Sequence, residues 1–252
     1  MSDFLLLIII LCLNSFMKKK RFSFKAILIL LLGAFFLGLV FTIFNSTGVK
    51  DRYDWLTLKS SQKLDVPLEN QYPDLPNGCE VTSLSMLLRY YDVKVNKLDL
   101  SENIKHVSSY TDDGKYRGNP HVGFVGYMSQ ANAGWCVYNE PLEQVGLKYT
   151  NRIKNFTNHD FIQVIKLVSD GHPVLIITTT NFNHVGDMQT WQTAQGEVHV
   201  TPSSHTCVIT GFDKKSRIVY VNDPFGHKNK AIPWKNLEKS YNQQGKQALY
   251  LK

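Results

Sequence analysis

The stretch that decides the fold is Leu75–Tyr91, LPNGCEVTSLSMLLRYY, in which a Pro-Asn-Gly turn leads through a cysteine into an amphipathic segment. Apolar residues recur at helical spacing from Val81 onward, so we expect a helix over residues 79–91. A thiol at a helix N-terminus lies at the positive end of the helix dipole, which favours the thiolate. The stretch therefore predicts that Cys79 is a nucleophile, although an isolated buried cysteine is more often an inert core residue.

A base for this thiol is present on a predicted β-hairpin. Residues 205–212, HTCVITGF, and 217–223, RIVYVND, have the composition of strands, and a polar turn separates them. A simple antiparallel register places His205 directly opposite Asp223, where a carboxylate would orient the imidazole. Cysteine at a helix start, then histidine and acid on successive later strands, is the papain-like order, and a Cys-to-His spacing of about 130 residues fits it. Gln71 precedes Cys79 and is a candidate donor to an oxyanion.

The chain also resembles the C-thirty-nine-like cysteine peptidases, relatives of the double-glycine leader peptidases. The resemblance covers about residues 64–251 and is carried by VPLENQYPDLPNGCEVTSLSMLLRYY, FVGYMSQANAGWCVYNEPLEQV, SSHTCVITGFDKKSRIVYVNDPFG and IPWKNLEKSY. It implies a papain-like fold, a peptide or protein substrate and no metal or organic cofactor. By the resemblance, Cys79 is the nucleophile, His205 the base, Asp223 the orienting acid and Gln71 the oxyanion donor. Papain-like enzymes usually hold the glutamine about six residues before the cysteine, and the Pro-rich insert here would have to bulge.

Two alternatives to a peptidase remain open at this stage. The sequence carries no transporter or nucleotide-binding segment, so we expect a stand-alone exported member of the family rather than a leader peptidase. A peptidoglycan amidase or acyltransferase of the same fold would use the same triad on a cell-wall peptide. A catalytically inactive surface binding module on the same fold is the second alternative.

The order of the predicted elements is typical of an α+β fold, in which N-terminal helices pack on a C-terminal antiparallel sheet. We expect Asn77 to cap the first helix and Asn158 to cap a later one. The polar segment around residues 181–199 is interpreted as a loop. The expected helices are 79–91, 97–105, 141–147, 158–169 and 235–243, and the expected strands are 63–71, 173–180, 205–212, 217–223 and 247–252.

An apolar run near the N-terminus predicts the compartment. Residues 26–44 contain no charge over 19 positions, long enough for a transmembrane helix. The basic segment MKKKRFSFK precedes the run and favours a cytoplasmic N-terminus of residues 1–25, with the folded part extracytoplasmic. We expect a single-pass anchor rather than a cleaved signal peptide. We interpret residues 1–16 as a mis-assigned start.

The remaining organisation follows from composition. Residues 45–62 are polar and are predicted to link the anchor to a peptidase domain over 63–252. The net charge of the chain is +7, and the five basic residues and one acidic residue within 1–44 account for more than half of it. The folded part has no basic stripe, which argues against a nucleic-acid partner. The expected partners are a peptide substrate, cell-wall peptide included, and the membrane.

Three loop aromatics, Trp135, Tyr138 and Trp191, are candidates for lining a peptide groove, although aromatic residues can also pin loops together. His184, Asp187 and His199 have no spacing typical of a metal site, so no metal is expected. Cys136 and Cys207 are either free or paired with each other. An odd number of cysteines after residue 63 requires at least one free thiol.

Overall fold

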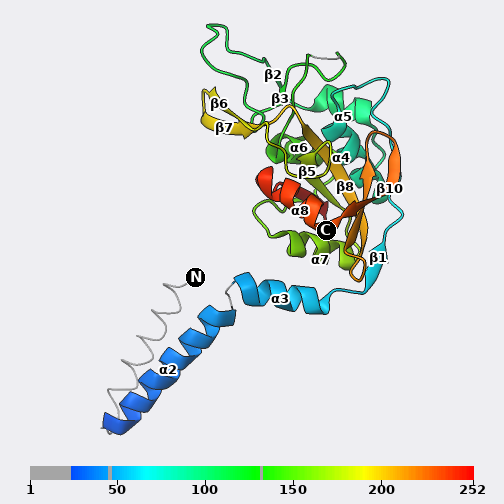
Figure 1. Ribbon diagram of the computed structural model, residues 1–252. Helices are drawn as coiled ribbons and strands as arrows, with labels where there is room; N and C mark the ends of the chain where they lie inside the picture. Colours follow the sequence, from blue (N-terminus) through cyan, green and yellow to red (C-terminus); the bar gives the residue numbers. More distant parts are fainter. Residues whose placement is uncertain (1–23, 45–46, 131–132) are drawn as a thin grey trace. The chain divides into compact units, whose positions relative to one another are not determined.

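The computed structural model describes residues 24–44, 47–130 and 133–252, and it divides the chain into two compact units, Met1–Tyr53 and Asp54–Lys252 (Figure 1). Helix α2, Phe24–Phe44, covers the predicted anchor. Within the part of the chain that is described, no helix is both long and apolar enough to cross a membrane. Membrane anchoring therefore stays a prediction. The basic cluster at residues 18–21 and the suspected mis-assigned start lie outside the described residues.

The predicted linker contains regular structure. Helix α3 spans Thr47–Thr57, and strand β1, Ser61–Lys63, pairs with the distal end of β8. Within the second unit, the Trp55 ring meets the Trp234 ring edge-on at 5.6 Å and lies 4.0 Å from the guanidinium of Arg217. Residues 54–62 of the predicted linker therefore belong to the folded second unit.

An antiparallel sheet forms the centre of the second unit, with strand order β10-β9-β8-β5-β11-β4 and β1 paired outside this path (Figure 1). The β5 strand is buried at every position because it lies inside the sheet and is covered by helices. This mixed arrangement of helices and an antiparallel sheet confirms the predicted α+β class. The strands are β4 Ile153–Asn155, β5 Val174–Thr179, β8 Ser204–Asp213, β9 Ile218–Asp223, β10 His227–Pro233 and β11 Ala248–Leu251.

Five helices pack around this sheet. The predicted helix 79–91 is confirmed as α4, whose residues Cys79–Leu88 are all buried and which contacts β8 and β5. Helix α8 is fixed to β5 by a buried hydrogen bond between Ser240 and Thr178, 2.7 Å long. The other bounds are α4 Cys79–Tyr90, α5 Lys97–Asn103, α6 Asn139–Leu147, α7 Phe161–Ser169 and α8 Trp234–Gln243.

Several local predictions were wrong for identifiable reasons. The expected strand 63–71 ends at Lys63, because the next residues leave the ladder and serve as hydrogen-bond partners for other segments. The expected loop around 181–199 contains most of a hairpin of β6, Gln189–Thr193, and β7, Gly196–Val200. A short parallel pair, β2 His106–Val107 and β3 Phe124–Val125, was not expected either.

The two predicted helix caps were also wrong. Asn77 does not cap α4: its side-chain amide donates to the carbonyl groups of Tyr127 and Gln130, at 3.1 and 2.6 Å. The amide therefore fastens the helix entrance to the following loop. Helix α7 begins after Asp160, which forms a capping box with Gln163, so Asn158 lies outside the helix.

Candidate active site

Cys79 is the first residue of α4, and the turn before it is compact. The Gly78 amide donates to the Leu75 carbonyl at 2.9 Å. A Cβ atom at Gly78 would lie 2.6 Å from the Leu75 Cβ, which is closer than side-chain atoms approach in folded proteins. Glycine at this position therefore lets the chain turn tightly enough to present Cys79 at the helix N-terminus.

The thiol of Cys79 is nearly buried, with 8% of the residue exposed. Burial raises the pKa of Cys79 well above its ordinary value, the Glu80 carboxylate raises it further, and the neighbouring Thr206 hydroxyl lowers it. The sequence led us to expect the opposite direction from the helix dipole alone. The dipole is outweighed here because the thiol lies in a dry site beside an acid, so the resting group is protonated.

Glu80 is the residue at this end of α4 that the sequence analysis missed. Its side chain is buried, with Oε1 accepting from the Val137 amide at 3.1 Å and Oε2 without a hydrogen-bond partner among the described residues. Burial raises the pKa of Glu80 to about 7. The signal was visible as an acid directly after the candidate nucleophile, but its burial could not be predicted from that position.

His205 and Asp223 form the other part of the site. His205 Nε2 lies 2.9 Å from Asp223 Oδ1, and both residues are buried. This bond occupies Nε2 and leaves Nδ1 as the other ring nitrogen. Burial alone would raise the pKa of Asp223, but hydrogen bonds from His205 and Lys230 outweigh it and hold the pKa well below its usual range.

The contact between these two residues was predicted, whereas the register was not. We expected His205 opposite Asp223, but the observed partners Val208 and Asn222 set a register that differs by two residues. An even offset keeps the side chains of His205 and Asp223 on one face of the sheet, so they still meet. The β8 strand carries a bulge between Ile209 and Gly211, and alternation in the sequence gives no sign of it.

Aromatic rings enclose the imidazole. The Phe225 ring stacks on His205 at a centroid distance of 4.4 Å, and the Phe182 ring meets it edge-on at 5.8 Å. Phe225 in turn stacks on Tyr72, which is about half exposed. These rings fix the plane of the imidazole and exclude water from it.

Gln71 connects the two parts of the site. Its backbone amide donates to the carbonyl of Pro224, the residue after Asp223, at 2.8 Å. Its side-chain Nε2 donates to the Pro76 carbonyl at 2.6 Å, three residues before Cys79, while Oε1 is buried without a partner. Two consecutive turns accommodate the insert that separates Gln71 from Cys79.

The structure places Cys79 beside Thr206, the neighbour of His205 on β8. Side chains of successive strand residues point to opposite faces, so the contact with Thr206 does not by itself bring the thiol to the imidazole of His205. Within the described part of the chain, Cys79 and His205 are not hydrogen-bonded to each other. Catalytic hydrogen bonds are often loose before substrate binds, so this geometry leaves the predicted roles open.

The three predicted groove aromatics take part in packing. Tyr138 and Trp191 are 2% and 3% exposed, and the Tyr138 hydroxyl donates to the His199 carbonyl at 2.7 Å. The rings of Trp135 and Trp191 meet edge-on at 4.7 Å. These contacts hold two long segments together, and direct contact of the three rings with substrate stays a prediction.

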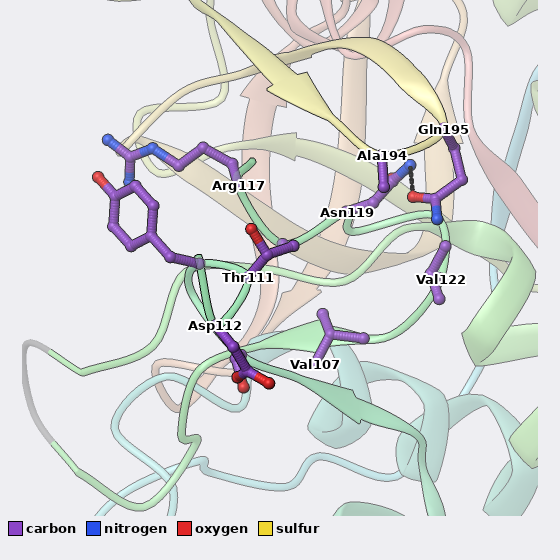
Figure 2. Close-up of a pocket in the computed structure, with 11 residues that line it drawn as sticks. Val107, Thr111, Asp112, Arg117, Asn119, Val122, Ala194 and Gln195 are labelled. Atoms are coloured by element: carbon purple, nitrogen blue, oxygen red, sulfur yellow. Dashed lines mark hydrogen bonds between the residues drawn. The ribbon is translucent and has the colours of Figure 1, made fainter. Parts of the chain in front are cut away.

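A cavity of about 370 Å³ lies beside this aromatic cluster (Figure 2). Arg117 lines it, and its guanidinium lies 4.6 Å from the Trp191 ring and 4.5 Å from the Tyr110 ring. On another wall, the Asn119 amide donates to Gln195 at 3.1 Å, the dashed bond in Figure 2.

The open question on the cysteines is answered within the described residues. Cys79, Cys136 and Cys207 are all free and buried, so Cys136 and Cys207 are not paired. Cys136 lies close enough to Cys79 and Glu80 for their charges to interact, and the Glu80 carboxylate raises the pKa of Cys136 as well as that of Cys79.

Comparison with known proteins agrees with this geometry. Residues 63–249 match the model of the Peptidase_C39 like family. The chain belongs to this family. It is 40% identical over 198 residues to the uncharacterized protein YvpB of Bacillus subtilis (strain 168), a match that covers 77% of this chain and 78% of the relative. A crystal structure of a C39-like peptidase candidate from Bacillus anthracis is similar at 36% identity and a TM-score of 0.73, covering 77% of this chain and 98% of that one.

Proposed function

We propose that this chain is a cysteine peptidase in which Cys79 is the nucleophile, His205 the base and Asp223 the orienting acid. The observation that carries the proposal is the buried hydrogen bond between His205 and Asp223, beside a helix that begins at a cysteine. Membership of a peptidase-like family supports the same chemistry. Gln71 is proposed as an oxyanion donor because its amide lies at the entrance of the same helix.

The proposed reaction follows from these positions. The Cys79 thiol passes its proton to His205 Nδ1 as its sulfur forms a bond to the substrate carbonyl carbon. The oxyanion accepts hydrogen bonds from the Cys79 N–H and from Gln71 Nε2. Collapse of this intermediate breaks the C–N bond, and His205 gives its proton to the leaving amine. Water then attacks the thioester, with His205 taking the proton of the water, and the acid product and free thiol are released.

Because the pKa of the Cys79 thiol is raised, the transfer of its proton to His205 is the demanding step of this reaction. In the resting site the proton stays on sulfur, because burial and Glu80 disfavour the thiolate. Asp223, which is hydrogen-bonded to His205, favours this transfer because its carboxylate stabilises the imidazolium that forms. We therefore expect the thiolate–imidazolium pair to form whenever the thiol approaches His205, and a substrate carbonyl or an alkylating reagent then traps it.

Alkylation of the full-length protein tests this proposal. Cys79 should react with iodoacetamide well below pH 8, and Cys79→Ala and His205→Ala should each abolish that fast reaction. Peptide mass spectrometry locates the modified cysteine, with buried Cys207 as an internal control. A Cys79 that reacts no faster than a free thiol at every pH from 4 to 9 would contradict the proposal.

An inactive binding module is the second candidate, and the protonated thiol favours it. Such a protein would show no dependence of Cys79 reactivity on His205. A peptidoglycan amidase or acyltransferase would share the reactive thiol, and digestion of purified peptidoglycan separates it from a peptidase.

We also propose that the peptidase unit is anchored on the outer side of the membrane. The support is the charge-free run 26–44 and the basic residues before it. Protease added to intact cells should then degrade the peptidase unit. Its survival until the cells are lysed would contradict this location.

A further inference from the structure

We propose that Lys230 is a positioning residue of the triad, delivered to Asp223 by a β-bulge, and that it sets the pH range in which Cys79 reacts. The inference rests on the proposed function and deepens it. The family resemblance did not point to Lys230, and the simple alternation of a strand would not place its side chain beside Asp223.

Both oxygens of Asp223 are held. Oδ1 accepts from His205 Nε2 at 2.9 Å and from the Phe225 amide at 3.1 Å. Oδ2 accepts from Lys230 Nζ at 2.8 Å and lies 3.4 Å from Nδ1 of His227. The carboxylate is fully buried, so it cannot turn without losing one of these partners. Lys230 therefore fixes the orientation in which Asp223 meets His205.

The bulge in β10 is what brings Lys230 to this face. His227 pairs with Asp223 and Lys230 pairs with Val221, so β10 advances three residues while β9 advances two. Val221 and Asp223 share a face because they are two residues apart, and Lys230 shares it because paired residues point the same way. Without the extra residue, Asn229 would lie opposite Val221 and Lys230 would point to the other face.

The extra residue is built into a network of its own. Asn229 has φ +51°, in the left-handed region, and its amide donates to Asn222 Oδ1 at 3.0 Å. Its side-chain oxygen accepts from the Thr210 hydroxyl at 2.8 Å. Thr210 is the bulged residue of β8, on the other side of β9. Two bulges are thus joined next to the candidate triad, where bulges commonly re-aim a side chain.

The ammonium group is placed to influence the triad as a charge. Lys230 Nζ lies 4.7 Å from the Phe182 ring, which also touches His205, so the cation is held in place. It favours the charged form of the Asp223 carboxylate. Two other ionisable groups act directly on Asp223, namely His227 on β10 and Cys207 on β8, and the candidate nucleophile Cys79 and its neighbour Glu80 lie on α4, which packs against β8.

Removing the charge should therefore shift the pH dependence upward. Without Lys230, thiolate formation at Cys79 becomes less favourable, because the site then holds one positive charge fewer to balance the anion. The side chain of Lys230 is 35% exposed, so solvent screens part of the effect. We expect a shift of about half a pH unit.

The test is Cys79 alkylation by iodoacetamide from pH 4 to 9, in the full-length protein, with Lys230→Met, Lys230→Gln and Lys230→Arg. Lys228→Met is the matched control, because Lys228 lies on the same strand but pairs with Asp65 at 2.6 Å. At a given pH below the midpoint, the alkylation rate should fall about threefold, equivalent to half a pH unit, in the Met and Gln variants and stay unchanged in the Arg and Lys228 variants. Thermal melts establish whether each variant is folded. If Lys230→Met is unfolded, Lys230→Gln still tests the proposal, because glutamine removes the charge and keeps a hydrogen-bond donor.

Failure of the role of Lys230 can be distinguished from failure of the proposed function. If His205→Ala slows alkylation but the Lys230→Met and Lys230→Gln profiles coincide with Lys228→Met, the role of Lys230 is refuted and the peptidase proposal stands. If His205→Ala leaves the reaction of Cys79 unchanged, the proposed function fails and this inference fails with it.

Discussion

His205 and Asp223 on one side of the site, and Cys79 with its neighbours on the other, differ in how fully their polar groups are satisfied. The carboxylate of Asp223 has partners on both oxygens, and the imidazole is held between aromatic rings. Around Cys79, several buried polar atoms have no hydrogen-bond partner among the described residues; they include Gln71 Oε1, Glu80 Oε2, Thr82 Oγ1, Ser83 Oγ and Thr206 Oγ1. Unsatisfied buried groups are uncommon in folded proteins and are associated with functional sites.

In the proposed peptidase, this difference means that the base, His205, is held in place before substrate binds, whereas the surroundings of Cys79 are completed on binding. An organised base costs nothing at the moment of reaction.

The largest effect is expected for Asp223→Asn. The change removes a buried anion with a hydrogen-bonded imidazole and a lysine as partners, so we expect a loss of about 3 kcal/mol or more in the free energy of unfolding at pH 7. Urea unfolding measures it. Asp65→Asn is the control, because its surface pair with Lys228 should contribute less than about 1 kcal/mol.

The stability lost in Asp223→Asn should depend on pH. The pKa of Asp223 is lowered in the folded state, so its contribution is complete above the unfolded value of about 4 and is lost as the pH falls toward the folded value. The deficit of Asp223→Asn should therefore shrink between pH 5 and pH 3. A deficit that is equal at both pH values would show that the lost stability does not come from the charged carboxylate.

An effect of opposite pH sign is expected for Glu80→Gln. The pKa of Glu80 is raised to about 7 in the folded state, so its contribution is present below the unfolded value and is lost as the pH rises through 7. Wild-type stability should lose about 3 kcal/mol from this group between pH 4 and pH 8, and the variant should not show that loss. Glutamine keeps the acceptor for the Val137 amide, so the wall beside the thiol is preserved.

The same variant sharpens the contrast through the thiol. Because the Glu80 carboxylate raises the pKa of Cys79, its removal should speed Cys79 alkylation near pH 8. Glu143→Gln, which changes a carboxylate bonded to Asn155 on the outside of α6, should leave the rate unchanged. Equal alkylation rates in wild type and Glu80→Gln would mean that burial alone holds the proton on sulfur.

Much of the fold was predictable because periodicity and composition report burial directly. The helix at Cys79 and the strands around His205 and Asp223 follow from apolar spacing, and the meeting of these two side chains survived an error of two residues in register. Side-chain alternation depends only on whether the offset is even or odd.

The rest depended on features that spacing does not carry. A bulge adds one residue without changing composition, so neither the register at Asp223 nor the position of Lys230 could be predicted. The direction of the pKa shift at Cys79 depends on burial by distant segments, including the strand that carries Thr206. The helix dipole, which can be inferred from the sequence, lowers the pKa of the thiol, and desolvation in the folded protein outweighs that effect.

The smallest effect is expected for Arg117→Met. The guanidinium of Arg117 stacks on rings from two separate segments, at Tyr110 and Trp191, and cation–π contacts of this kind contribute about 0.5–1 kcal/mol. Methionine retains part of the apolar contact. We expect a loss of stability within that range and faster amide hydrogen exchange in residues 106–118 and 189–200. Arg217→Met, which removes a similar contact with Trp55, is the control and should leave exchange in those two segments unchanged.

The alkylation rate of Cys79 in Arg117→Met then decides how far the nucleophile side extends. Trp135 touches Trp191 and directly precedes Cys136, and Val137 binds Glu80, so a chain of contacts runs from the aromatic cluster to the thiol. If only the hydrogen bond to Glu80 positions this wall, alkylation should be unchanged in Arg117→Met. A clear change in the rate would show that the aromatic cluster supports the nucleophile, and the boundary between the two sides of the site would then have to include the β6–β7 hairpin.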